Sequence, residues 1–112
     1  MQEGEAVYKL DLYVPTTHIK QVKDALAAAG AGKIGKYDSC MWTTNGLGQF
    51  RAQVGSQPFI GGIGAIHHVE EAKIECIIYE SNLKDAINAM IKAHPYECPS
   101  FQYWKINVQP PQ

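Results

Sequence analysis

Two segments of this chain lie far apart in the sequence and share one pattern. In each, a run of alternating apolar and polar residues comes directly before a run with the apolar spacing of an amphipathic helix. In the first, apolar residues fill every second position over 8–14, which predicts a half-buried strand that ends at Pro15. Thr16 or Thr17 is then placed to cap a helix, and Gly30 is a natural left-handed stop for it. Spacings of three and four residues give this helix an apolar stripe of Ile19, Val22 and Leu26.

The second segment repeats this order nearer the end of the chain. Residues 69–79 alternate again and predict another strand, after which Ser81 or Asn82 can cap a second helix. The buried face of that helix is predicted to hold Leu83, Ala86, Ile87, Met90 and Ile91. The pair His94-Pro95 breaks the helix, and a last strand is expected over 101–108.

The stretch between these segments is rich in glycine. It holds nine of the ten glycines: Gly30, Gly32, Gly35, Gly46, Gly48, Gly55, Gly61, Gly62 and Gly64. We expect a strand over 37–44, a tight turn at Asn45-Gly46 and a returning strand over 49–54. Residues 55–64 are too apolar for a free linker, so they predict an ordered loop.

The resulting order, β-α-β-β-α-β, predicts an α+β sandwich of the ferredoxin-like, split β-α-β type with an extended central loop or hairpin. We expect residues 1–112 to form one domain, with both helices on one face of an antiparallel sheet. The other face is predicted to carry Val7, Tyr13, Ile77, Tyr79, Phe101 and Tyr103. A sheet face this apolar favours self-association.

Composition excludes several classes of function. The net charge of −1 leaves no basic surface for nucleic acid. No apolar stretch is long enough to span a membrane and no secretory signal is visible, so we expect a cytoplasmic protein. The three cysteines, Cys40, Cys76 and Cys98, are odd in number and widely spaced, which favours reduced thiols.

A short segment after the second helix carries three side chains that can bind a transition metal. His94, Glu97 and Cys98 offer an imidazole, a carboxylate and a thiolate within five positions. The alternative is structural: Pro95 ends the helix, His94 caps its last carbonyls and Tyr96 packs. The adjacent residues His67 and His68 precede a strand and should point to opposite faces, so they do not readily bind one ion.

Arg51 is the single arginine of the chain and lies in the glycine-rich stretch. It can pair with an anionic ligand or with an acidic residue of a neighbouring subunit. No Ser-His-Asp order, paired-carboxylate motif or His-Glu-x-x-His element occurs, so we expect no enzymatic activity.

Three runs of residues resemble one known family. They are Gly30 to Cys40, Pro58 to Gly61, and the His-Pro-Tyr-Glu-Cys-Pro sequence over 94–99. Together they resemble the middle domain inserted in the NGG-one-interacting-factor-three (YqfO-type) proteins. That insert is itself similar to the trimeric PII signalling and CutA proteins. The resemblance implies a stand-alone version of the insert, without the dinuclear metal site and the hydrolase-like activity of the flanking domain.

The same resemblance suggests where ligands would bind. CutA proteins share the His-Pro-Tyr element, whose histidine is a proposed copper ligand, and His94 matches it. The cysteine of their first strand has no counterpart here, because Leu12, Tyr13 and Val14 occupy that stretch.

Three hypotheses follow, and the first is a homotrimeric binding or sensing module with a small ligand between subunits. Its predicted ligand-binding residues are Gly35, Tyr37, Arg51, Phe59 and Gly61. The second is a divalent-metal protein that binds copper or zinc through His94, Glu97 and Cys98. The third is an accessory module for a separate metal-domain partner.

Overall fold

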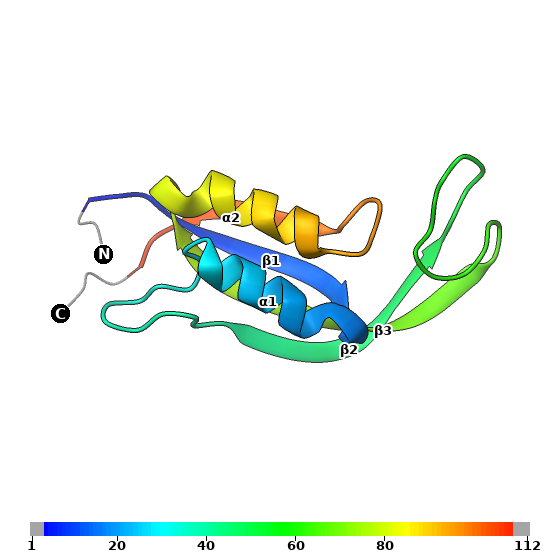
Figure 1. Ribbon diagram of the computed structural model, residues 1–112, viewed down its shortest axis with the longest axis horizontal. Coiled ribbons are helices and arrows are strands. Elements are labelled where there is room, and N and C mark those ends of the chain that lie inside the picture. Colours follow the sequence, from blue (N-terminus) through cyan, green and yellow to red (C-terminus); the bar gives the residue numbers. More distant parts are fainter. Residues whose placement is uncertain (1–3, 109–112) are drawn as a thin grey trace.

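The computed structural model describes residues 4–108, and within them the chain forms a four-stranded antiparallel sheet with two helices (Figure 1). The elements are β1 (Val7–Pro15), the 3-10 turn η1 (Thr16–His18), α1 (Ile19–Ala28), β2 (Trp42–Arg51), β3 (Ile66–Tyr79), α2 (Glu80–Ala93) and β4 (Phe101–Ile106). The strands lie in the order β2-β3-β1-β4. This order confirms the predicted ferredoxin-like α+β class. No helix within 4–108 is long and apolar enough to cross a membrane.

Both helices cover the same face of the sheet (Figure 1) and form one core with it. From the helices, Val22, Leu26, Ala86 and Met90 are fully buried, as predicted, whereas Ile91, which was also predicted to be buried, is 43% exposed. The sheet contributes every second residue of its central strands: Leu10, Leu12 and Val14 from β1, and Ala72, Ile74, Cys76 and Ile78 from β3. Burial raises the pKa of the Cys76 thiol to about 12, so this thiol is protonated and acts as a small apolar side chain.

The structure confirms the predicted end of α1 but not the predicted N-cap residues of the two helices. Gly30 has a φ of 99° and its N–H donates to the Ala27 carbonyl, so the predicted left-handed stop is confirmed. The predicted caps are wrong: Thr16 and Thr17 form η1, and neither helix has a side-chain hydrogen bond from its N-cap residue. At α2 the Glu5 carboxylate accepts the Ser81 N–H instead.

The central hairpin differs from its prediction. β2 runs unbroken from Trp42 to Arg51, and Asn45 and Gly46 lie in mid-strand opposite Ala72 and Glu71 of β3. The expected Asn-Gly turn is therefore wrong, because pairing along the 14-residue β3 outweighs the local turn preference. The connection between the strands lies at 52–65 instead.

One end of the hairpin projects from the body of the molecule (Figure 1). β1 stops pairing with β3 at Pro15, opposite Glu71, so residues 66–70 pair with β2 alone. We call residues 47–70 the arm. The arm gives the molecule its elongated form, with Cα extents of 51 × 24 × 22 Å.

The uncovered face of the sheet is more charged than predicted. Lys9 Nζ lies 2.8 Å from Glu75 Oε1 and 3.3 Å from Asp11 Oδ1, and Lys73 Nζ lies 3.4 Å from Asp11 Oδ2. The hydrogen bond to Glu75 is the largest cause that raises the pKa of Lys9. Large apolar side chains such as Trp104 flank this network, with Lys9 Nζ 5.6 Å from the centre of its ring.

Two aromatic residues of β4 lie on the opposite face from the one predicted. Phe101 pairs with Leu12 and Tyr103 with Leu10, so both share the helix-covered face. Phe101 packs against the core, and its ring stacks on that of Tyr103. The prediction assigned the alternating residues of β4 to the wrong faces of the sheet. Trp104 and Ile106 lie on the uncovered face instead.

Candidate functional site

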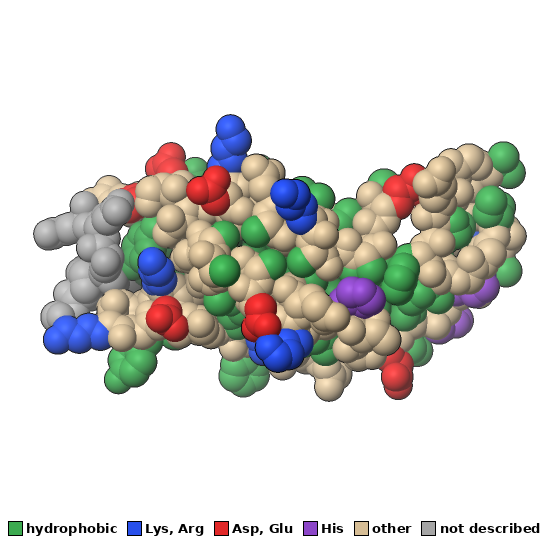
Figure 2. Space-filling model, in the orientation of Figure 1, with side chains coloured by type: hydrophobic (Ala, Val, Ile, Leu, Met, Phe, Trp, Pro, Cys, Tyr) green, Lys and Arg blue, Asp and Glu red, His purple; other side chains and the backbone are tan. Residues whose placement is uncertain are grey.

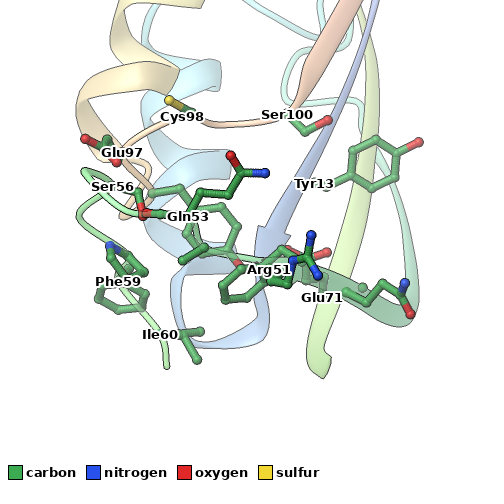
Figure 3. Close-up of a pocket in the computed structure, with 16 residues that line it drawn as sticks. Tyr13, Arg51, Gln53, Ser56, Phe59, Ile60, Glu71, Glu97, Cys98 and Ser100 are labelled. Atoms are coloured by element: carbon green, nitrogen blue, oxygen red, sulfur yellow. Dashed lines mark hydrogen bonds between the residues drawn. The ribbon is translucent and has the colours of Figure 1, made fainter. Parts of the chain in front are cut away.

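A pocket of about 450 Å³ lies where the arm leaves the body of the protein. Figure 2 shows the surface hollowed between the arm and the rest of the molecule, and Figure 3 shows the residues that line the pocket. They come from the end of β1, the arm, β3 and the α2–β4 loop (residues 94–100). The labelled side chains are Tyr13, Arg51, Gln53, Ser56, Phe59, Ile60, Glu71, Glu97, Cys98 and Ser100.

Arg51 is the one positively charged residue of this lining. It is the last residue of β2, and its side chain is among those that line the pocket (Figure 3). Within residues 4–108, no hydrogen bond or ion pair engages Arg51. An exposed guanidinium at a pocket, with its donors unused, can bind an anion in a bidentate way.

Tyr96 and Glu71 form the rear of the pocket. The Tyr96 hydroxyl donates to Glu71 Oε2 at 2.7 Å, which ties the α2–β4 loop to β3. Burial, together with this bond to the carboxylate, raises the pKa of Tyr96 above its usual range, so the phenol stays protonated. The other oxygen, Glu71 Oε1, fills the space where a side chain on Gly48 would stand.

Two contacts hold the loop of the arm against the α2–β4 loop. Glu97 Oε1 accepts the Gln57 N–H at 2.9 Å. The ring of Phe59 lies edge-on to that of His18, with ring centres 5.4 Å apart, and is tilted by 49° to that of Tyr96, with ring centres 6.3 Å apart. These contacts close the pocket on the side of Glu97 and Phe59, so the arm and the α2–β4 loop form one continuous wall.

His94 has a structural position beneath this wall. It is 6% exposed, its Nε2 lies 2.6 Å from the Tyr13 carbonyl, and its Nδ1 accepts the Tyr96 N–H at 3.2 Å. Because Nδ1 accepts, the proton resides on Nε2 and the ring is neutral. Burial lowers the pKa of His94, against the opposing effects of the Tyr13 carbonyl and the Glu71 charge.

This arrangement does not fit a transition metal. Both ring nitrogens of His94 are engaged, the Glu97 carboxylate binds Gln57, and Cys98 is exposed. Among residues 4–108, no three His, Cys, Asp or Glu side chains are grouped so that they could hold an ion. The copper or zinc hypothesis stays a prediction, with no contact in its favour.

The structure divides the predicted ligand-binding residues between two places. Arg51 and Phe59 line the pocket, as do Glu97 and Cys98 from the predicted metal set. Gly35 and Tyr37 lie at the other end of the sheet, in a tight turn closed by two hydrogen bonds between Ile34 and Tyr37. Gly61 lies outside the pocket, where the ring of His67 occupies the space beside it.

Sequence reasoning missed several residues of the pocket. Tyr13, Gly48, Glu71 and Ser100 come together only through the pairing of β1, β2 and β3 and the return of the α2–β4 loop. Glu70 and Glu71 are adjacent in the sequence, and only the strand register decides which of the two carboxylates faces the pocket. Tyr96 was noted as a packing residue, without its bond to Glu71.

Comparison with known proteins places this chain within longer relatives. It is 46% identical over 102 residues to the GTP cyclohydrolase 1 type 2 homolog of Halalkalibacterium halodurans and 41% identical to that of Bacillus subtilis. In both cases the match covers 91% of this chain and 27% of the relative. The chain therefore spans about a quarter of the length of these relatives. No protein-family model matches it.

Solved structures agree with both the sequence similarity and the fold. A Bacillus cereus protein related to NIF3 matches 93% of the chain, and 26% of its own length, with a TM-score of 0.80 and 38% identity. CutA of Synechococcus elongatus has a TM-score of 0.65 and 20% sequence identity. This match covers 94% of the present chain and 80% of the CutA chain. The ATP complex of Bacillus subtilis GlnK has a TM-score of 0.59 and 11% sequence identity. This match covers 91% of the present chain and 84% of GlnK. The chain is thus similar in sequence to one segment of the NIF3-related GTP cyclohydrolase 1 type 2 homologs, and its fold is that of CutA and GlnK.

Proposed function

We propose that the protein is a homotrimeric binding or sensing module of the PII/CutA type that takes a small ligand at a subunit interface. The observation that carries this proposal is the pocket at the base of the arm, with the unpaired guanidinium of Arg51 on its wall. A concave site with apolar walls and a few convergent polar groups is the usual form of a ligand site. The ATP complex of GlnK supports the proposal, since it shows that a protein of this fold can bind a small ligand.

Exposed apolar side chains support self-association. Trp42 and Trp104 are 68% and 44% exposed, and they flank the charged network on the uncovered face of the sheet. The arm exposes Leu47, Val54, Ile63 and Ile66. Assembly through these surfaces would bury them and would bring the turn at Gly35 and Tyr37 of one subunit toward the pocket of another.

The function named for the relatives belongs to proteins more than three times as long as this chain. The third hypothesis, an accessory role beside a separate metal-domain partner, rests on that similarity alone. It is compatible with the trimer, because the pocket and the uncovered sheet face need no other domain to form.

Light scattering on the purified protein tests the assembly. We expect a trimer at micromolar concentration, dissociated by Ile77→Arg, which places a charge in the middle of the uncovered face. Asn88→Arg adds the same side chain to the solvent side of α2 and should leave the trimer intact. A monomeric wild-type protein would contradict both the trimer and the interface site.

A further inference from the structure

The charges of the pocket narrow the class of ligand that it can bind. The charged residues of the lining are Arg51, Glu71 and Glu97, which give a net charge of −1. The two carboxylates are committed, because Glu71 accepts the Tyr96 hydroxyl and Glu97 accepts the Gln57 N–H. Of these three charged side chains, Arg51 is the one that no hydrogen bond or ion pair engages within residues 4–108.

This lining does not suit a polyphosphate. Sites for several phosphates use more than one cation, a helix N-terminus or a row of free backbone N–H groups. No residue from the first turn of α1 or α2 lines the pocket. Gly48 is the one glycine of the lining, and Glu71 Oε1 occupies the space beside it, so this glycine does not offer an open backbone to a chain of phosphates.

The walls suit a flat apolar body instead. Phe50, Phe59, Tyr13 and Tyr96 line the pocket together with Ile60. The Tyr96 hydroxyl is already donated to Glu71, so the ring is the part of this residue left for a ligand. A planar group can stack on such rings, and a single guanidinium matches a single carboxylate through two parallel hydrogen bonds.

We propose that the ligand of this pocket is a small monocarboxylate with a flat apolar body, bound through its carboxylate by Arg51. This inference rests on the proposed function, because it takes the pocket to be the binding site. On this proposal the arm selects the ligand through two residues. Arg51 binds the carboxylate, and Phe59, which His18 and Tyr96 hold in place, covers the apolar part of the ligand.

Amide chemical shifts of the ¹⁵N-labelled full chain test the proposal with four probes. Phenylacetate carries both features, phenylacetamide has the same shape without the charge, and inorganic triphosphate and benzylamine represent other classes. We expect phenylacetate to shift the amide signals of Gln53, Ser56 and Ser100, with Asn88 on the solvent side of α2 as the distant reference. Loss of the charge in phenylacetamide should weaken binding by about tenfold or more.

Matched variants then assign the effect to Arg51. Arg51→Gln should weaken phenylacetate binding by about tenfold or more, while Lys84→Gln removes one positive charge from the solvent side of α2 and should change nothing. Equal binding of phenylacetamide, tighter binding of triphosphate or benzylamine at these amides, or an unchanged affinity in Arg51→Gln would overturn the ligand class and leave the binding module standing. If none of the four probes shifts the pocket amides, the ligand class and the pocket as the binding site both fail.

Discussion

The Tyr96 hydroxyl and the Glu71 carboxylate meet at 2.7 Å and join the α2–β4 loop to β3 at the rear of the pocket. Hydrogen bonds to charged groups contribute about 1.5–3 kcal/mol, so Tyr96→Phe should lower the free energy of unfolding by about that amount or somewhat less at this half-buried position. Denaturant unfolding measures the change. Tyr103→Phe is the control, because no hydrogen bond engages its hydroxyl within residues 4–108; an equal loss there would contradict this role of Tyr96.

Gly48 and Gly46 form a matched pair within β2. Replacing a strand glycine with alanine ordinarily stabilises by about 0.5–1 kcal/mol, and Gly46→Ala should do so, since nothing lies near its added methyl group. The methyl group of Gly48→Ala overlaps Glu71 Oε1 and should displace Glu71 from Tyr96. We therefore expect the double variant Gly48→Ala/Tyr96→Phe to be little less stable than Tyr96→Phe alone. Full additivity in the double-mutant cycle would contradict this coupling.

His94 should make stability depend on pH. Its pKa is lowered in the fold, chiefly by burial, while the unfolded chain binds a proton near pH 6.5. The stabilisation of the neutral form is therefore complete above about pH 6.5 and is lost as the pH falls, with a slope of at most about 1.4 kcal/mol per pH unit.

Unfolding free energies between pH 7.5 and 5 check this dependence. His94→Gln keeps a donor for the Tyr13 carbonyl but cannot titrate, so its stability should fall less steeply than that of wild type. His68→Gln, on the exposed surface of the arm, is the control and should follow the wild-type curve. Parallel curves for His94→Gln and wild type would show that His94 does not cause the dependence.

The loop of the arm should open when its contact with Glu97 is removed. Glu97→Ala frees the Gln57 N–H, and loss of a partly exposed bond of about 1 kcal/mol predicts exchange about fivefold faster in peptides covering 53–62. Glu70→Ala is the control: it removes a carboxylate of the arm that does not bind the Gln57 N–H, so it should leave these exchange rates unchanged. Unchanged exchange in Glu97→Ala would mean that Phe59 alone holds the loop.

Local sequence patterns predicted the strands and helices better than they predicted how the strands pair and which sheet face a residue takes. Period-two alternation located β1 and β3, and spacings of three and four located both helices, because each pattern reflects burial on one side. The Asn45-Gly46 turn failed, since pairing with β3 outweighs a two-residue signal. The faces of Phe101 and Tyr103 also failed, because parity in a six-residue strand depends on its register with β1.

The pocket was predictable only in part for the same reason. Arg51 and Phe59 could be singled out as rare side chains in a glycine-rich stretch. Glu71 and Tyr13 belong to strands whose polar residues give no local sign of a ligand. Gly35 and Tyr37 were predicted to share a site with Arg51 and Phe59, whereas their turn lies at the end of the sheet opposite the arm (Figure 1).

Native mass spectrometry of the protein purified directly from cells tests the central claim most directly. The account predicts the mass of three chains together with an additional small mass on each subunit. Arg51→Gln changes one exposed side chain at the end of β2 and leaves the rest of the sheet as it is, so it should keep the three chains and lose the added mass. A single chain without added mass at micromolar concentration would contradict the trimer and its ligand together.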